Sequence, residues 1–279
     1  MTIDEIISNA LAEDIGDGDH TTLATIPVNT MGKARLLVKD NGILCGVDLA
    51  ERIFHKVDPV TRVTIYIRDG AAIKKGDVVF EVDGKSASIL QAERLVLNFM
   101  QRLSGIATAS SRAVKLLAGL KTKILDTRKT TPLLRELEKF AVRTGGGSNH
   151  RMGLYDMVMI KDNHVDYAGG IVQAIDAVEK YLDRTGKKLK IEIEVRNFVE
   201  LQQVLDHGKI DRIMLDNFSV KEMKKAVLLI GGRFETEASG GITEKNLRKY
   251  AETGVDYISM GALTHQIKSL DMSLKAEQK

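Results

Sequence analysis

Three short segments of this chain concentrate the side chains that are best suited to chemistry. Residues 126–132 read DTRKTTP, residues 145–151 read GGGSNHR and residues 160–164 read IKDNH. They contribute the cationic or ionisable side chains of Arg128, Lys129, His150, Arg151 and Lys161. A solvated helix face spaces its charges three or four residues apart, whereas these lie beside glycines, at turns and directly after an apolar run. This placement favours a pocket that holds a strongly anionic small molecule.

The elements that must position these segments alternate between strands and helices. Strands are predicted at residues 123–127, 157–160, 190–195, 212–216, 234–238 and 257–260. Helices are predicted at residues 106–120, from Pro132 to near Gly145, and at residues 172–182, 198–205, 220–229 and 244–253. Repeated strand–helix units predict a parallel sheet with right-handed crossovers. Because a complete eight-unit barrel takes about 250 residues, residues 105–265 are expected to form an irregular, incomplete α/β barrel of six or seven parallel strands.

The N-terminal part of the chain follows a different pattern. Strands are predicted at residues 33–39, 62–68 and 76–84, where alternating or apolar runs end at turn signals. Helices are predicted near the N-terminus, at residues 50–57 and at residues 86–103, with Gly105 as a break. This pattern indicates an N-terminal α+β domain with an antiparallel sheet over residues 1–104. The C-terminal tail, residues 266–279, is expected to pack back near this domain.

Charge and composition exclude several classes of protein. The 279 residues carry a net charge of +3, no Trp and only 5% aromatic residues, which argues against a nucleic-acid-binding surface. The one cysteine, Cys45, allows neither a disulfide within the chain nor a Cys-based zinc site. No apolar run approaches the roughly 20 residues of a membrane span, and the acidic N-terminus is unlike a signal peptide. We therefore expect a cytoplasmic protein that binds neither nucleic acid nor a membrane.

In a barrel of parallel strands, chemistry takes place where the strands end. The residues at or just after the predicted strand ends are Thr127, Arg128, Lys129, Lys161, Glu194, Asp216, Ser239, Gly240, Gly241 and Gly261. Each also has an ordinary structural interpretation. Glu192 and Glu194, which share one strand face, could line a solvated edge, and Asp216 could begin a turn. Their joint position at the ends of separate strands favours one common site.

Glycines at such a position have a physical use, because their backbone N–H groups can approach phosphate oxygens closely. Residues 239–241 precede a predicted helix whose N-terminal dipole would help to hold phosphate. The chain contains no GxxxxGK[ST] loop and no complete GxGxxG motif, which argues against P-loop and Rossmann sites. The sequence predicts a different kind of phosphate pocket.

The segments described above closely resemble the quinolinate phosphoribosyltransferase family. The likeness extends to residues 13–22 (EDIGDGDHTT), 93–94 (ER), 215–218 (LDNF), 238–242 (ASGGI) and 259–265 (SMGALTH), in order along almost the whole chain. The resemblance implies an N-terminal α+β domain, an irregular α/β barrel and a homodimer. It implies that quinolinate contacts Arg128, His150, Arg151 and Lys161, with Arg94 entering from the neighbouring subunit. It assigns the phosphoribosyl pyrophosphate side, with Mg²⁺, to Lys129, Lys161, Glu194, Asp216, Ser239, Gly240 and Gly261.

The chain departs from the family pattern at one position. Leu133 follows Thr-Thr-Pro, where the family usually has glycine. If Pro132 starts a helix, leucine is tolerated there, and only the local loop shape is affected.

The resemblance implies phosphoribosyl transfer to quinolinate with decarboxylation, which gives nicotinate mononucleotide, pyrophosphate and CO₂ in NAD biosynthesis. Arginine forks match carboxylates bidentately, and lysines act as compact charges against phosphate. Glu194 and Asp216 can hold ribose hydroxyls or Mg²⁺ and favour positive charge at the anomeric carbon. Catalytic roles are therefore expected for Lys129, Lys161, Glu194 and Asp216.

Three alternatives stay open at this level. One is an aldolase-like barrel in which Lys161 forms a Schiff base. Another is a binder of phosphorylated metabolites that has no catalytic activity. The third is the molybdenum-transport-linked relative of the same superfamily.

Overall fold

The computed structural model describes residues 1–277, which group into two compact units. The first unit comprises Met1–Ser111, Thr131–Gly146 and the chain from Gln266 onward. The second comprises Arg112–Thr130 and Gly147–His265. The site residues expected at the strand ends all belong to the second unit, whereas Arg94 belongs to the first.

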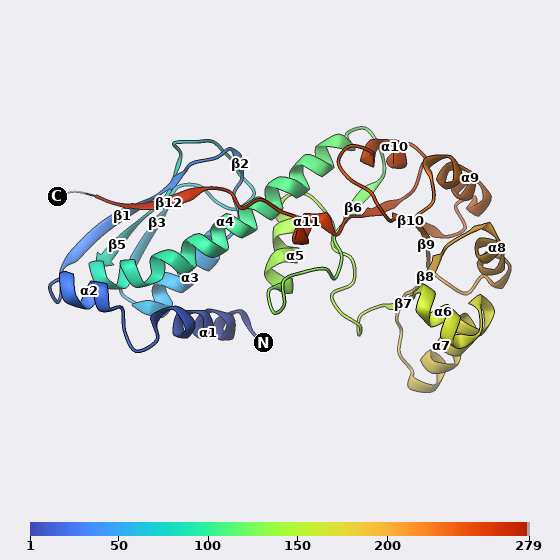
Figure 1. Ribbon diagram of the computed structural model, residues 1–279, viewed down its shortest axis with the longest axis horizontal. Coiled ribbons are helices and arrows are strands. Elements are labelled where there is room, and N and C mark those ends of the chain that lie inside the picture. The colour runs from blue at the N-terminus through green and yellow to red at the C-terminus, as the bar shows by residue number, and fades with distance from the viewer. Residues whose placement is uncertain (278–279) are drawn as a thin grey trace. The chain divides into compact units, whose positions relative to one another are not determined.

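The first unit is built on an antiparallel sheet with the strand order β12-β1-β5-β3 (Figure 1). These strands are β1 (Met31–Val38), β3 (Arg62–Ile65), β5 (Val78–Lys85) and β12 (Met272–Ala276), and a small ladder joins β2 (Gly42–Ile43) to β4 (Ala72–Ile73). The helices of this unit are α1 (Ile3–Ile15), α2 (His20–Thr25), α3 (Val47–Val57), α5 (Arg135–Thr144) and most of α4 (Ser86–Leu116). The predicted α+β architecture with an antiparallel sheet is confirmed.

The core of the first unit is formed by apolar side chains that recur at strand spacing and at helix spacing in its sequence. Ala34, Leu36 and Val38 alternate along β1 and are fully or almost fully buried, as one face of a strand requires. Phe80 on β5 meets Phe54 on α3 edge to face, with ring centroids 5.9 Å apart.

Helix α4 runs without interruption through Gly105, so the predicted break at this residue is wrong. A Cβ atom on Gly105 would lie 2.5 Å from the carbonyl oxygen of Lys268. Glycine is therefore needed for close packing of the C-terminal segment and not to end the helix. Leu270 N–H also donates to the carbonyl of Gln101 on α4, at 2.9 Å.

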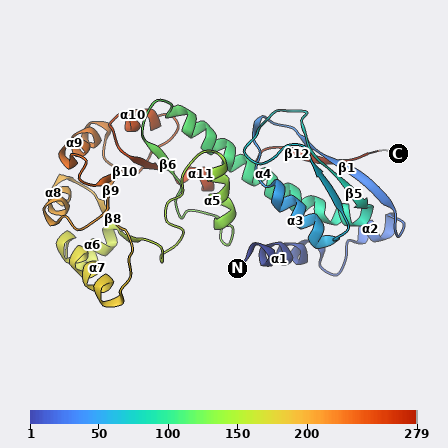
Figure 2. The same cartoon turned by 180° about the vertical axis from the view of Figure 1, so that it is seen from behind.

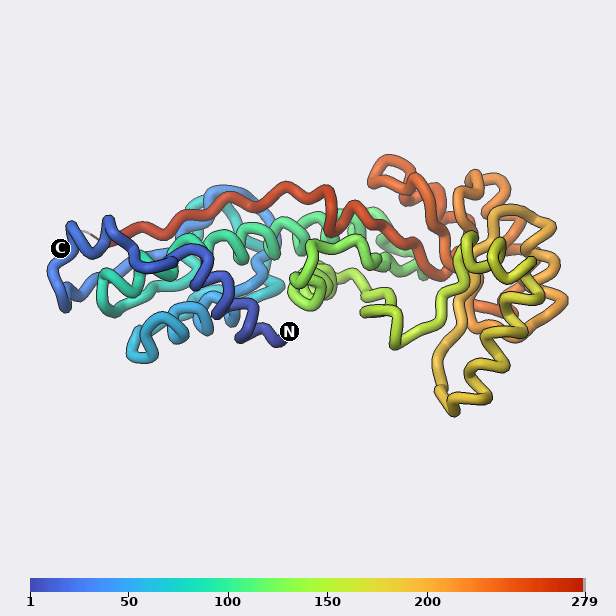
Figure 3. Tube along the Cα trace, turned by 60° about the horizontal axis from the view of Figure 1, so that its bottom comes forward, coloured from blue at the N-terminus to red at the C-terminus, as the bar shows by residue number. Residues whose placement is uncertain are grey.

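The C-terminal segment lies beside elements from the start of the chain (Figure 3). Strand β12 pairs with β1 in a register that places Leu274 opposite Leu36. The Gln101 side chain donates to the carbonyl oxygen of Met272 at 2.9 Å. Residues that are distant in the sequence thereby complete one sheet.

The second unit contains the expected parallel sheet, in the order β6-β11-β10-β9-β8-β7 within the described residues. Its strands are β6 (Lys123–Leu125), β7 (Val158–Ile160), β8 (Ile191–Val195), β9 (Arg212–Asp216), β10 (Glu235–Ser239) and β11 (Tyr257–Ser259). Its helices are α6 (Asp162–Ala168), α7 (Ile171–Thr185), α8 (Phe198–His207), α9 (Val220–Ile230), α10 (Leu247–Ala251) and α11 (Ala262–His265). In both cartoon views α7, α8 and α9 lie along one side of the sheet (Figure 2). The prediction of an incomplete α/β barrel is confirmed.

Three local predictions in this region need correction. Pro132 does not open α5, which begins at Arg135, because Leu133 has a φ of 68° that no helix accepts. The helix expected at residues 244–253 is shorter and begins only at Leu247, so its N-terminus does not directly follow residues 239–241. Helix α6, which follows Lys161 directly, had no counterpart among the predicted elements.

Within residues 1–277, none of the helices is both long and apolar enough to cross a membrane.

Candidate active site

The register of the parallel sheet aligns the polar residues at the strand ends. Ile160 lies opposite Ile193, so the next residues of β7 and β8 are Lys161 and Glu194. Asp216 at the end of β9 lies opposite Ser239 at the end of β10. The helices that follow β8 and β9 start within a few residues, at the capping residues Asn197 and Ser219. Short, capped connections of this kind hold side chains in place at the rim of the sheet.

Glu194 and Asp216 form an acidic pair beside Lys161. Burial raises the pKa of Glu194, the Asp216 carboxylate raises it further, and the charge of Lys161 opposes this shift. Glu194 is only 9% exposed, so the repulsion between the two carboxylates is weakly screened. The pair favours a cation or a developing positive charge between them.

The loop after β10 needs its glycine because Asn217 lies against it. A Cβ atom on Gly240 would lie 2.2 Å from the side-chain oxygen of Asn217, and the φ of Gly240 is 94°. Asn217 itself has a φ of 57°, and its amide donates to the Asp216 carboxylate at 2.5 Å. Since Gly241 also has a positive φ, the residues after β9 and β10 expose backbone in a conformation that suits an anion nest.

Lys129 extends over the loop after β11. A Cβ atom on Gly261 would lie 3.0 Å from Cδ of the Lys129 side chain. The Thr264 hydroxyl donates to the Lys129 carbonyl oxygen at 2.6 Å, and Lys129 N–H donates to the Thr127 hydroxyl at 3.1 Å. The segment after β6 is therefore fixed to the segment after β11, and Lys129 itself is exposed.

The guanidiniums of Arg128 and Arg151 lie close enough to repel each other. Burial lowers the pKa of Arg151, and the neighbouring Arg128 guanidinium lowers it further. Arg151 is 9% exposed and donates to the carbonyl oxygen of Met157 at 3.3 Å. By contrast, Arg196 just after β8 is paired with Asp166 and Glu200. Two guanidiniums in this arrangement favour an anionic ligand.

The segment that carries His150 is held by Asp126, which follows β6 directly and is fully buried. The Asp126 carboxylate accepts the His150 backbone N–H at 2.9 Å and the side-chain amide of Asn149. Asp126 N–H in turn donates to the carbonyl oxygen of Ser148 at 3.1 Å. Asp126 was part of a recognised segment but was not among the expected site residues, because a buried carboxylate that holds a neighbouring segment leaves no signal in the sequence.

A layer of buried charges lies beneath the rim, on the same sheet face as Glu194. Glu192 and Glu237 have no exposed surface, and both carboxylates lie near His150 Nε2, at 3.0 and 3.4 Å. Arg212 pairs with Glu237 at 3.2 Å and with Glu235 at 3.0 Å, and its guanidinium lies 4.0 Å from the centre of the Tyr257 ring. Glu192, Glu237 and His150 lie close enough together to hold a metal ion, but Arg212 already supplies positive charge to this layer.

The proton balance of this layer is coupled. Burial raises the pKa of Glu192 to about 7. Burial lowers the pKa of His150, but the adjacent carboxylates of Glu192 and Glu237 outweigh this and raise it to about 9. Arg151 N–H donates to His150 Nδ1 at 2.6 Å, which requires that this nitrogen carry no proton. The layer therefore retains a proton at neutral pH that His150 and Glu192 share, and the backbone bond favours placing it toward Glu192.

The strand-end residues of the second unit thus form three neighbouring groups. One contains Arg128 and Arg151, one contains Lys129 and Gly261, and one contains Lys161, Glu194, Asp216, Ser239 and Gly240. His150 differs from the expectation in its environment, because its side chain is only 5% exposed and lies in the buried layer. Arg94 is an exposed residue of α4 in the first unit.

Comparisons with known proteins agree on one family. The model described as "Quinolinate phosphoribosyl transferase, C-terminal domain" matches residues 106–275, and the corresponding N-terminal domain model matches residues 19–104. Quinolinate phosphoribosyltransferase (decarboxylating) 1b of Nicotiana tabacum is 47% identical, over 98% of this chain and 81% of the relative. A probable nicotinate-nucleotide pyrophosphorylase (carboxylating) of Bacillus subtilis is 41% identical, over 98% and 93%. The solved nicotinate-nucleotide pyrophosphorylase from Francisella tularensis has a TM-score of 0.92 and 40% identity, over 99% and 96%.

Proposed function

Because this chain belongs to the quinolinate phosphoribosyltransferase family, we propose that it transfers the phosphoribosyl group of 5-phosphoribosyl 1-pyrophosphate to quinolinate. Loss of one carboxyl group then gives nicotinate mononucleotide, pyrophosphate and CO₂. We further propose that this reaction serves NAD biosynthesis in the cytoplasm.

One observation carries the proposal: four cations that lack ion pairs lie together in the segments that follow the parallel strands β6 and β7. Within residues 1–277, Arg128, Lys129, Arg151 and Lys161 make no salt bridge to a carboxylate. Other cations near the sheet, such as Arg196 and Arg212, are paired. Unpaired cations in one place destabilise the ligand-free protein, so a strongly anionic ligand is the simplest reason for them.

We assign the quinolinate carboxylates to the arginine side of the site. The Arg128 and Arg151 guanidiniums present two planar forks, which suit two adjacent carboxylates on a flat ring. His150 supports this side through the backbone N–H of Arg151. Holding the ring in this way directs its nitrogen toward the sugar, and correct orientation of two reactants removes a large part of a reaction barrier.

We assign phosphoribosyl pyrophosphate to the side formed by Lys129, Lys161, Glu194, Asp216 and residues 239–241. The lysines would neutralise the departing pyrophosphate, and the exposed backbone at Gly240 and Gly241 would receive the 5-phosphate. Glu194 and Asp216 also fit Mg²⁺, since they offer oxygen ligands and repel each other. Bound there, the ion would supply charge stabilisation for the pyrophosphate.

The chemistry then needs position and charge more than a covalent intermediate. The ring nitrogen forms a bond to the anomeric carbon as the bond to pyrophosphate breaks, and the carboxylates of Glu194 and Asp216 favour the positive charge on the sugar. The product is a pyridinium, which accepts the electron pair that remains when the carboxyl group beside nitrogen leaves as CO₂. A proton from solvent then replaces that carboxyl group on the ring.

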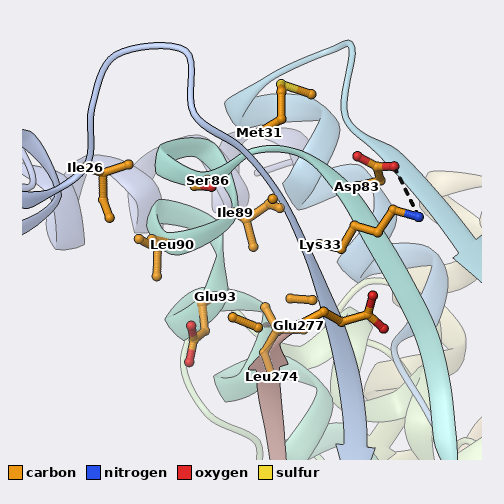
Figure 4. A pocket seen from close by; sticks show the side chains of 13 residues that line it. Ile26, Met31, Lys33, Asp83, Ser86, Ile89, Leu90, Glu93, Leu274 and Glu277 are labelled. Carbon is orange, nitrogen blue, oxygen red and sulfur yellow. Dashed lines mark ion pairs between the residues drawn. The ribbon is translucent and has the colours of Figure 1, made fainter. Parts of the chain in front are cut away.

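We also propose that the protein is a homodimer in which Arg94 of one subunit serves the site of the other. Arg94 is exposed on α4, one residue after Glu93, which lines a groove of about 640 Å³ in the first unit (Figure 4). The groove is lined mainly by apolar side chains, among them Ile89 and the exposed residues Met31 and Leu90. An exposed apolar surface beside an arginine that makes no ion pair within residues 1–277 supports an interface between copies of the chain.

The direct test is an assay of the purified protein with phosphoribosyl pyrophosphate and quinolinate, with nicotinate as the control substrate. We expect release of pyrophosphate and CO₂ in equal amounts with quinolinate and neither product with nicotinate. Pyrophosphate release with nicotinate, or tight binding without turnover, would overturn the proposal.

The Schiff-base alternative is disfavoured by the position of Lys161. Its positive charge acts on the Glu194 carboxylate, which is also close to Asp216, and these are not the apolar surroundings that make a lysine a nucleophile.

A further inference from the structure

The buried layer under the site contains more carboxylates than Arg212 alone can neutralise. Arg212 hydrogen-bonds with Glu235 and Glu237 and stacks on Tyr257. Glu192 lies 3.9 Å from Arg212 but only 3.0 Å from His150 Nε2. A carboxylate with no exposed surface is costly without a partner, so the position of Glu192 is explained by His150 better than by Arg212.

His150 transmits this contact to the ligand side of the site. Its backbone N–H is held by Asp126 at 2.9 Å, and its Nδ1 accepts the backbone N–H of Arg151 at 2.6 Å. Arg151 is the next residue and presents its guanidinium beside Arg128. One imidazole nitrogen thus lies against buried carboxylates, and the other accepts a hydrogen bond from the main chain of an anion-binding arginine.

We propose that Glu192 and Glu237 are positioning residues for recognition of a vicinal pyridine dicarboxylate, and that they act through the Nε2–H tautomer of His150 on the orientation of Arg151. The proposal rests on the function proposed above and adds residues that touch no substrate. A bidentate fork must keep its geometry within about 0.5 Å and 10–20° to be effective. The carboxylates supply this constraint from the buried layer beneath the ligand, on the same face of the sheet.

The experiment compares Glu192→Gln and Glu237→Gln with Glu235→Gln as the matched control. Glu235 hydrogen-bonds Arg212, as Glu237 does, but its side chain is 37% exposed, whereas that of Glu237 is fully buried beside His150. The glutamine variants keep the size of the side chain and remove its charge. We expect KM for quinolinate to rise about tenfold in Glu192→Gln and Glu237→Gln, with KM for phosphoribosyl pyrophosphate unchanged. In Glu235→Gln, both KM values should stay within about twofold of wild type.

Two results would overturn the inference. Equal increases for both substrates would indicate general damage to the barrel, and an unchanged quinolinate KM in folded Glu192→Gln and Glu237→Gln would show that the carboxylates do not position the site. If one of these variants fails to fold, the other decides the question.

A second measurement does not depend on turnover. The ¹⁵N NMR signals of the histidine side chains report the tautomer, and the His150 signal can be assigned by its loss in His150→Gln. We expect an Nε2–H tautomer between pH 6 and 8 in the wild type and in Glu235→Gln, and a mixture of tautomers in Glu192→Gln. An Nδ1–H tautomer in the wild type would contradict the inference. Absence of wild-type activity with quinolinate would instead contradict the proposed function.

Discussion

At the residue scale, the protein separates the charges it leaves available from the charges it neutralises. Arg128 and Lys161 are exposed and unpaired within the described residues, whereas Arg212 is enclosed by acids and an aromatic ring. The two sets occupy successive layers of the same sheet face. A ligand can therefore meet strong positive charge without removing an ion pair that the fold requires.

Lys161→Ala tests the charge at the end of β7. We expect kcat to fall by at least about 100-fold with the fold intact, because the ammonium stabilises charge that develops on the leaving group. Lys161→Arg is the control and should retain more activity. A rate near that of wild type in Lys161→Ala would remove this residue from the site.

Arg151→Ala tests the division of the site into two sides. We expect weaker binding of quinolinate by about 2–4 kcal/mol, since one partner of a charged bidentate contact is lost, and unchanged binding of phosphoribosyl pyrophosphate. Isothermal titration with each substrate measures both values. Normal affinity for both would contradict the assignment of Arg151.

The buried layer predicts a dependence of stability on pH. The proton that His150 and Glu192 share contributes stability that is fully present below pH 6.5 and is lost as the pH rises through 9. We expect the free energy of unfolding to fall by about 1–3 kcal/mol between pH 7 and 9.5. The decrease should be smaller in His150→Gln, by denaturant titration. Parallel pH curves for the two proteins would contradict this account.

At the scale of single elements, the sequence was most informative where one rule acted alone. The strands of the parallel sheet were predicted to within a few residues, because long apolar or alternating runs have few other uses. The same reasoning failed at Gly105, Pro132 and residues 244–246. There the local preference of one residue was overridden by a contact from a distant segment or by the conformation of a neighbour.

Leu133 is strained in the turn before α5. Its φ of 68° is a left-handed conformation that glycine adopts freely, and its side chain is 67% exposed. A non-glycine residue there costs roughly 1–2 kcal/mol, which the entropy of glycine in the unfolded chain partly offsets. We expect Leu133→Gly to raise the free energy of unfolding by up to about 1 kcal/mol.

Leu133→Ala is the control for this substitution, because it removes the same side chain and keeps the strain. The glycine variant should be more stable than the alanine variant in denaturant titrations. If alanine were equal or better, backbone strain at residue 133 would not be the relevant quantity.

At the scale of the whole molecule, the proposed homodimer makes a prediction that no single subunit can satisfy. Arg94→Ala and Lys161→Ala should each be nearly inactive alone. In mixed dimers, one of the two sites would combine an intact Arg94 with an intact Lys161, so about a quarter of wild-type activity should return when subunits mix freely. This estimate follows from half of the dimers being mixed with one complete site each.

Subunit exchange followed by the quinolinate assay measures this recovery. A mixture of Lys161→Ala with Glu194→Gln is the control. Both changes affect the strand-end site of their own subunit, so Arg94 from a partner cannot restore either site. Failure of the Arg94→Ala mixture to recover activity would count against a shared site.

The sequence by itself determined the fold class, the parallel strands and the set of residues at their ends. Those features depend on periodicity and on the position of glycines and charges, which are properties of short segments. The motifs also determined the family, because they occur in one order along the chain.

Only the tertiary structure decided which charges are available to a ligand and which are neutralised by neighbouring side chains. Glu192 and Glu194 look alike in the sequence, yet one lies in the buried layer with His150 and the other at the rim with Asp216. The difference arises because the protonation state and the contacts of a side chain depend on the residues that neighbouring strands place beside it. The register of β8 with β9 and of β9 with β10 determines which residues these are. For the same reason, the role of His150 could be read from its contacts but not from the motif that contains it.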